Sequence, residues 1–301
     1  MNLTILGSQG AIPKIGMYST SLLLQISKYN ILIDCCEGVQ FQLRKNKIRL
    51  SRIEIILISH AHGDHYFGLI GLISTLSLLK RTKKLTVFCP TSVLKIIQAH
   101  IKFSQMKLNY ELNLIGLTEN KMINIFENDV FFIKSFPLNH SIYTNGFLIK
   151  EKIRKRKLIL EKALHFDIDK IYFNKLTKGQ NVLNSKGVEI NYLDVTIEGD
   201  KPKSFAYCSD TAYNDDLINY VQDVDLLYCE TTFLSNDQEK AINTLHSTTA
   251  DAGKLAKKSN VKQLLIGHFS SRYDNYDLFL KEVSEIFPRV LLSEEGKKID
   301  I

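Results

Sequence analysis

Short apolar runs separated by polar turns mark the strands in the first third of the chain. A longer apolar stretch with small residues, Tyr66–Lys80, predicts a buried helix, and Thr91–Lys102 has a helical pattern behind a proline. The runs that predict strands are Leu3–Leu6, Ser21–Ile26, Asn30–Asp34, Glu54–Ser59 and Leu85–Cys89. Strands and helices therefore alternate from the start.

The last third of the chain returns to the same alternation after a strand-rich middle, Val130–Lys150. Its predicted strands are Ser204–Cys208, Asp225–Cys229 and Lys262–Gly267, and its predicted helices are Thr248–Lys258 and Tyr276–Phe287. Strands at both ends with helices between them predict an α+β fold. In it, two sheets pack together and helices cover them on the outside, as a four-layer αββα sandwich.

Residues 150–187 depart from this pattern because they are charged and less periodic. The chain has only 5 Pro and 15 Gly, with no obvious flexible linker and no internal repeat. We therefore expect one domain over residues 1–301, with 150–187 as an insertion that protrudes from it as a small arm.

Composition narrows the class of protein. The 45% hydrophobic content allows a sizeable core, and a net charge of +7 favours polyanionic partners, although a lysine-rich composition is also common in AT-rich genomes. No basic segment followed by an apolar run opens the chain, and no run of about 18 apolar residues occurs. The five cysteines lack C-x-x-C spacing. These features predict a cytoplasmic protein with buried reduced thiols and no membrane association.

The strongest chemical signal is the run His60-Ala-His62-Gly-Asp64-His65, which follows a buried strand and precedes a helix. Imidazole and carboxylate groups bind zinc at neutral pH, and Gly63 permits the tight turn that lets ligands this close in sequence converge. The pattern predicts a metal site.

The H-x-H-x-D-H run is similar to the motif of the metallo-β-lactamase superfamily. The resemblance implies that His60, His62 and His140 hold one metal, that Asp64, His65 and His268 hold the other, and that Asp210 bridges them. Two such ions can share a hydroxide nucleophile and stabilise the attacking and leaving oxygens of a phosphodiester. Zinc, two per subunit, is the expected metal, and ligand type alone leaves Mn²⁺ or Fe²⁺ open.

A narrower resemblance, to the ribonuclease Z family, covers nearly the whole chain. It rests on Leu6–Lys14, Leu32–Gln40, Tyr207–Thr211, Glu230–Phe233 and His246–Ala250. The resemblance implies an endoribonuclease that removes the 3′ trailer of precursor tRNA, acting as a homodimer. It also implies that His246 protonates the leaving oxygen, that Glu230 orients His246, and that Asp64 orients or deprotonates the attacking water as well as binding metal.

RNA contacts are expected at basic side chains. Six of the eight residues from Lys150 to Lys157 are basic, and the resemblance implies that this arm clamps the tRNA elbow through Arg154, Arg156 and Lys157. The alternative is a solvated charged hairpin with no role in RNA binding. Lys14 and Arg272 are further candidates, because Arg272 adds a cation beyond the last metal ligand, where a phosphate could meet it.

Two departures from the family pattern bear on detail. Phe166–Phe173 lacks the usual Gly-Pro turn of the arm, and Ile15–Ser19 replaces the usual Arg and Asn in the loop linked to the cleavage position and to rejection of CCA ends.

Two other functions would use the same metal ligands. One is a small-molecule phosphodiesterase, for example for cyclic nucleotides, and the other is a non-catalytic RNA-binding protein with structural metals.

Overall fold

The computed structural model describes residues 1–301, and its contacts divide the chain into two compact units. The first unit combines Met1–Lys150 with Lys203–Ile301, and the second is Glu151–Pro202. The insertion predicted at 150–187 falls almost entirely in the second unit, whose end lies further along the chain. None of the helices combines the length and apolar character that crossing a membrane requires.

The first unit contains two seven-stranded sheets. One has the order β18-β1-β2-β3-β4-β5-β6, with bounds Asn2–Gly7 (β1), Ser21–Ile26 (β2), Tyr29–Ile33 (β3), Ile53–Leu57 (β4), Leu85–Pro90 (β5), Leu112–Leu117 (β6) and Lys298–Asp300 (β18). The other has the order β17-β16-β15-β14-β9-β8-β7, with bounds Ile123–Glu127 (β7), Phe131–Pro137 (β8), Asn145–Glu151 (β9), Ser204–Cys208 (β14), Leu226–Glu230 (β15), Gln263–Gly267 (β16) and Val290–Leu292 (β17).

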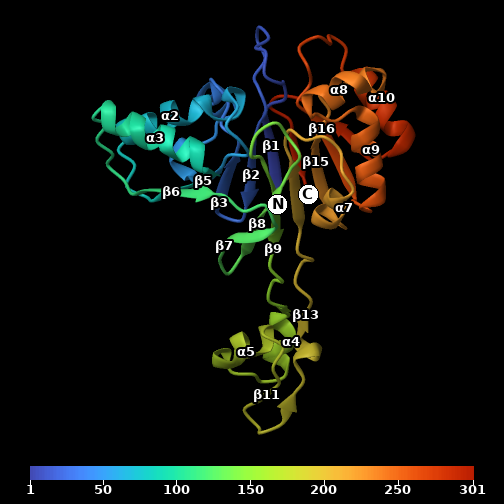
Figure 1. Ribbon diagram of the computed structural model, residues 1–301. Coiled ribbons are helices and arrows are strands. Elements are labelled where there is room, and N and C mark those ends of the chain that lie inside the picture. The colour runs from blue at the N-terminus through green and yellow to red at the C-terminus, as the bar shows by residue number, and fades with distance from the viewer. The chain divides into compact units, whose positions relative to one another are not determined.

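Helices cover the outer faces of both sheets (Figure 1). On the first sheet these are α1 (Val39–Lys45), α2 (Gly63–Leu78) and α3 (Thr91–Phe103). On the second they are α7 (Asp216–Val221), α8 (Gln238–Thr244), α9 (Thr249–Lys258) and α10 (Asp277–Ile286). Single-turn 3₁₀ helices occur at Leu50–Arg52 and Ser235–Asp237. The predicted α+β four-layer αββα sandwich is confirmed.

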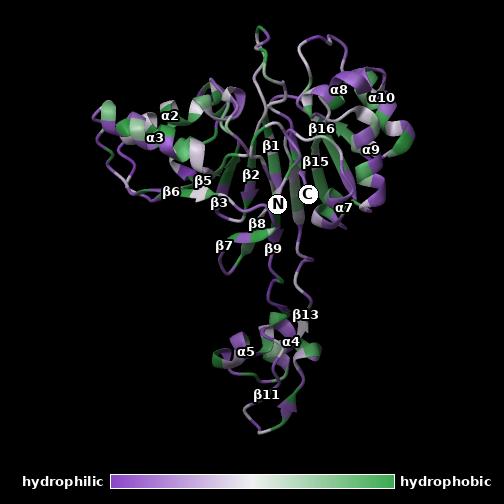
Figure 2. Ribbon diagram, viewed as in Figure 1, coloured by the Kyte–Doolittle hydropathy of each residue, from purple (hydrophilic) through white to green (hydrophobic).

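Three apolar clusters separate the four layers of this unit. Along β3, Leu32 belongs to the cluster beneath the outer helices, whereas its neighbours Ile31 and Ile33 belong to the cluster between the sheets. Successive strand residues point to opposite faces, so a strand buried on both faces is apolar throughout. This explains the continuous apolar runs in the sequence, and Figure 2 shows hydrophilic residues in the loops and on the helices. All five cysteines are buried and unpaired, as predicted.

The second unit has its own small apolar cluster, which includes Ala163, Leu176 and Val195. Its helices are α4 (Leu160–His165), α5 (Phe173–Thr177) and α6 (Tyr192–Val195), with a 3₁₀ turn at Lys170–Tyr172. Its strands form two pairs, β10 (Lys157–Leu158) with β13 (Thr196–Ile197) and β11 (Val182–Leu183) with β12 (Glu189–Ile190). The sequence pattern predicted none of these short elements.

One boundary in the first unit matters for the site. The helix predicted at Tyr66–Lys80 begins at Gly63, three residues earlier, and His62 is its extended N-cap residue. The first turn of α2 therefore contains Asp64, where the positive end of the helix dipole favours a carboxylate.

Candidate active site

The ends of parallel strands bring the predicted ligands to one edge of the sandwich. In the second sheet β14, β15 and β16 run parallel, and Asp210, Glu230 and His268 lie at or just beyond their carboxyl ends. In the first sheet β4 is parallel to its neighbours β3 and β5, and the chain after β4 leads through His60 into α2. Strand ends therefore explain why residues 150 or more positions apart meet.

The first ligand group contains His60, His62, His140 and Asp210, whose ligand atoms all lie within 4.8 Å of one another. His62 Nδ1 is 3.0 Å from His60 Nε2 and 3.3 Å from His140 Nε2. Burial lowers the pKa of all three histidines, so they are neutral near pH 7 and offer a lone pair.

The second group contains Asp64, His65 and His268. Asp64 Oδ2 is 3.2 Å from His65 Nε2 and 3.5 Å from His268 Nε2. Burial would raise the pKa of Asp64, but the charges of His65 and His268 lower it below its usual value. Asp64 is therefore ionised and could serve as a metal ligand.

Asp210 lies between the two groups and presents one oxygen to each. Its Oδ2 is 3.6 Å from His60 Nε2 and 3.9 Å from His140 Nε2. Its Oδ1 is 3.4 Å from His65 Nε2 and 3.3 Å from His268 Nε2. A carboxylate in this position can join two cations.

Three buried ligand atoms have no hydrogen-bond partner: Asp64 Oδ2, His65 Nε2 and His268 Nε2. A buried polar group without a partner costs about 1–3 kcal/mol, so these atoms require another partner. The seven side chains fit two divalent cations, because their donor atoms converge and are of the types that zinc prefers.

The opposite ring nitrogens of the ligands are held by neighbouring groups. Asp34, fully buried at the end of β3, is 2.7 Å from His65 Nδ1 and accepts hydrogen bonds from Ser59 and Tyr207. Thr232 Oγ1 is 2.8 Å from His268 Nδ1, and the carbonyl of Leu245 is 2.9 Å from His140 Nδ1. Such partners fix the tautomer that turns Nε2 inwards.

Three residues among the proposed ligands and their hydrogen-bond partners have strained backbone conformations. Asp34, Leu245 and His268 all adopt left-handed conformations, with φ of 53°, 54° and 61°. Side chains other than glycine rarely adopt this conformation, and it recurs at functional sites. Asp34, Ser59, Thr232 and Leu245 were not predicted as site residues. A signal existed only for Asp34, which closes an apolar run beside the strand that leads to His60.

Glu230 and His246 form a pair next to the ligands. Glu230 Oε1 is 2.7 Å from His246 Nδ1, and the fully buried carboxylate also accepts hydrogen bonds from the backbone of Thr211 and Thr232 and from the Thr232 hydroxyl. Burial would lower the pKa of His246, but the charge of Glu230 raises it to about 9. His246 therefore holds a proton near pH 7.

His246 is also close enough to the ligands to be considered one of them. Its ligand atom lies within 4.8 Å of those of Asp210 and His268. The bond from Nδ1 to Glu230 leaves only Nε2 available for either role. Metal binding and proton donation by His246 are therefore mutually exclusive roles of a single nitrogen atom.

A cavity of about 710 Å³ gives access to these groups. It is lined by proposed ligands from both groups and by His246, together with Gly10–Ile12, Phe233, Asn243–Leu245, Ser270 and Ser271. The volume is large enough for part of a macromolecular substrate.

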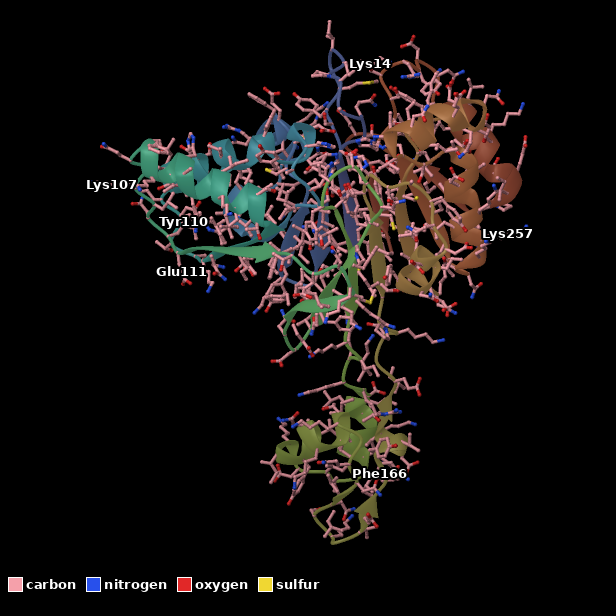
Figure 3. All side chains as sticks on the ribbon, in the orientation of Figure 1. Lys14, Lys107, Tyr110, Glu111, Phe166 and Lys257 are labelled. Atoms are coloured by element: carbon pink, nitrogen blue, oxygen red, sulfur yellow. The ribbon has the colours of Figure 1, made fainter.

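The predicted substrate contacts lie at different places. The Arg272 guanidinium lies 5.1 Å from the centre of the Phe233 ring, beside the cavity. Lys14 lies on the loop after β1 (Figure 3) and is 2.7 Å from Asp274, so part of its charge is neutralised. Lys14 lines a second cavity instead of the first.

The basic candidates of residues 151–202 all have partners within that unit. Arg154 pairs with Glu151 and Asp200, and Lys157 pairs with Asp200 at 2.7 Å. Arg156 donates to Thr196 and lies 5.2 Å from the centre of the Tyr192 ring. His100 and His165, for which no site role was predicted, are exposed.

The chain is similar in sequence to ribonuclease Z proteins over almost its full length. It is 37% identical to ribonuclease Z of Phocaeicola vulgatus over 99% of this chain and 96% of that protein. It is 39% identical to ribonuclease Z of Cytophaga hutchinsonii, over 98% of this chain and 94% of the relative.

Two further comparisons bear on family and fold. The family described as Anti-Pycsar protein Apyc1 matches residues 1–171. The crystal structure of the short form of human tRNase Z superposes with a TM-score of 0.72, at 24% identity, over 100% of this chain and 99% of that one. The fold is therefore shared beyond the sequence relatives.

Proposed function

This chain belongs to the ribonuclease Z family, a family of metal-dependent endoribonucleases that process the 3′ end of precursor tRNA, and we propose that the clustered His and Asp side chains are its catalytic centre. The observation that carries this proposal is the Glu230–His246 pair, 2.7 Å apart beside both ligand groups and one cavity. Water attacks the phosphodiester in this cavity and the 3′ trailer leaves.

His60, His62 and His140 would hold one divalent cation, and Asp64, His65 and His268 the other, with Asp210 between them. When bound, zinc ions would supply Lewis-acid stabilisation for the negative charge that develops on the phosphodiester. The same donor atoms would also bind manganese or iron.

Asp64 orients the attacking water. Its Oδ2 is buried without a hydrogen-bond partner, and its carboxylate lines the cavity. A carboxylate with a depressed pKa is a weak base, so its main contribution is to position the water. It accepts the proton only as the new P–O bond forms, when the attacking oxygen has become acidic.

His246 supplies the proton for the leaving oxygen. Glu230 holds Nδ1, which leaves Nε2 to donate as the P–O bond to the leaving group breaks. The raised pKa of about 9 keeps the imidazolium populated at neutral pH, and Glu230 stabilises its charge.

The unit at 151–202 contacts the body of the tRNA. Six basic residues between Lys150 and Lys157 outnumber their acidic partners, Glu151 and Asp200, so the segment remains positive. Basic side chains bind RNA phosphates without sequence preference. The protein acts in the cytoplasm as a homodimer, in which this unit of one subunit presents RNA to the site of the other.

The small-molecule phosphodiesterase alternative is not favoured. The two relatives described above, which match over 98–99% of the chain, are ribonuclease Z proteins. The match to the Apyc1 family ends at residue 171, before Asp210, Glu230, His246 and His268.

Cleavage of an end-labelled precursor tRNA with a 3′ trailer tests this function. With zinc or manganese present, we expect one cut near the end of the acceptor stem, and no cut by the Asp64→Ala variant. A wild-type protein that binds metal and hydrolyses a simple phosphodiester but leaves the RNA intact would contradict the assignment.

A further inference from the structure

A second cavity, of about 620 Å³, adjoins the active-site cavity. The two cavities share Ala11, Asp64 and Phe67 in their linings. Asp64 is a metal ligand of the proposed catalytic centre, so whatever fills the second cavity lies next to the reacting phosphate. Two exposed aromatic rings, Phe41 and Phe67, also line this second cavity.

Phe67 lies in both cavities, and its ring rests on the first turn of α2. A Cβ atom at Gly63 would come within 2.3–2.8 Å of the Phe67 ring, so the ring occupies space that only glycine leaves free. Gly63 separates the ligands His62 and Asp64. The ring therefore lies against the turn that carries two proposed ligands, and 59% of Phe67 is exposed.

Phe41 lies on α1 and is 70% exposed. Its neighbour Gly38 begins this helix in a left-handed conformation, with φ of 72°. A Cβ at Gly38 would lie 2.8 Å from the Tyr18 ring and 3.7 Å from that of Phe41. Tyr18 and Phe41 therefore both lie next to Gly38 in the lining of this cavity, where a side chain larger than that of glycine would meet the Tyr18 ring.

The charges around this cavity disfavour a phosphate. Its only basic lining residue is Lys14, which is bonded to Asp274, to the carbonyl of Tyr273 and to the Tyr276 hydroxyl. Two acidic residues, Glu37 and Asp64, line it as well. An occupant with a flat, uncharged ring fits better than an anion.

We propose that Phe41 and Phe67 form a stacking site for an unpaired nucleobase of the RNA that directly flanks the scissile phosphate. Unpaired bases are recognised by stacking on aromatic side chains, whereas paired bases of an RNA helix are not accessible to them. The site rests on the proposed function and adds to it a specificity element for single-stranded RNA. The stacked base belongs to the last nucleotide of the product tRNA or to the first nucleotide of the trailer.

The test combines protein variants with RNAs that lack one base. Cleavage of three precursor tRNAs is measured as kcat/KM: an intact one, one abasic at the nucleotide before the scissile phosphate, and one abasic at the nucleotide after it. Wild type is compared with Phe41→Ala, Phe41→Leu, Phe41→Trp and Phe67→Leu. Phe103→Ala is the matched control, because Phe103 is 82% exposed on α3 and lines neither cavity.

On intact RNA we expect Phe41→Ala and Phe67→Leu each to lose about tenfold in kcat/KM, the effect of removing one base–aromatic contact. Phe41→Leu should lose nearly as much as Phe41→Ala, while Phe41→Trp and Phe103→Ala should match wild type. On the RNA that lacks the stacked base, wild type should fall to the level of the variants and the variants should lose nothing further. The abasic position at which this happens identifies the base.

Equal losses by the variants on all three RNAs, or no loss on intact RNA, would overturn the stacking site while leaving the endonuclease intact. Unchanged melting temperatures and metal contents of the variants would exclude a folding defect. Failure of wild type to cut any precursor tRNA is a different result, because it contradicts the proposed function itself.

Discussion

The two sheets contribute to the proposed metal site in different ways. From the first sheet, four proposed ligands within six residues, His60 to His65, follow a single strand. From the second sheet, three proposed ligands, His140, Asp210 and His268, follow three separate strands. The first set is local and depends on one turn, whereas the second exists only when the sheet has formed. Asp210 joins the two sets, with one oxygen toward each.

Asp210→Ala should have the largest effect, because it removes the residue shared by both groups. We expect cleavage to fall by more than about 10⁴-fold and bound metal to fall below one ion per chain, measured by elemental analysis. His268→Ala is the matched comparison, since His268 belongs to one of the two main groups. That variant should keep one ion, and equal metal loss in both variants would contradict the shared role of Asp210.

His246→Ala should lower kcat by about 10²–10⁴-fold, the usual contribution of a general acid, with metal content unchanged. The metal measurement separates the two roles open to His246, because a ligand would take an ion with it when lost. His100→Ala, on the exposed face of α3, should leave both kcat and metal content at wild-type values. Loss of one ion from His246→Ala would make this residue a ligand.

The pH profile tests the same residue without removing it. The pKa of His246 is raised to about 9, so its proton is present below that pH and is lost as pH rises through it. Single-turnover cleavage should therefore fall above pH about 9 in the wild type. In Glu230→Gln the carboxylate charge that raises the pKa of His246 is absent, so the alkaline limb of the pH–rate profile should move to lower pH. An unchanged limb in Glu230→Gln would show that another group titrates.

Substituting the residues that hydrogen-bond to the proposed ligands should weaken metal binding less than substituting the ligands themselves. Asp34→Asn, on the first sheet, and Thr232→Val, on the second, should each weaken metal binding by about 10–100-fold, read from a chelator titration. Asp34→Asn should release one ion more readily than the other, because Asp34 contacts only His65 among the ligands, apart from its link through Ser59. If both variants were as sensitive to the chelator as wild type, Asp34 and Thr232 would not contribute to metal binding through His65 and His268.

Lys157→Ala should have the smallest effect. Lys157 pairs with exposed Asp200 in the 151–202 unit, so its loss should raise KM about threefold, leave kcat unchanged and reduce the salt dependence of RNA binding by about one counterion. Lys95→Ala, on α3, provides the control. A lower kcat in Lys157→Ala would mean that this unit affects the chemical step.

The contrast between the sheets also explains how far the sequence could predict the site. His60, His62, Asp64 and His65 are recognisable from their spacing alone, because a strand followed by a turn brings them together. His140, Asp210 and His268 required a family resemblance, since no local pattern shows which strand ends are adjacent. The predicted strands and helices outside the insertion correspond to observed elements, but β6 and β7 were not predicted. The helices α1, α7 and α8 were also missed; they are short, so their formation depends on packing against the sheets.

The partners of the ligands were harder to predict. Thr232 and Leu245 act through a hydroxyl and a carbonyl, groups present at many positions, and only the folded backbone directs them at His268 and His140. The left-handed conformation of Leu245 has no sequence signal, because leucine rarely adopts it.

The most direct test of the shared metal centre is an anomalous difference map from crystals grown with zinc. We expect two peaks, one among His60, His62 and His140 and one among Asp64, His65 and His268, each in contact with one oxygen of Asp210. A single peak, or a peak held by His246, would contradict this expectation.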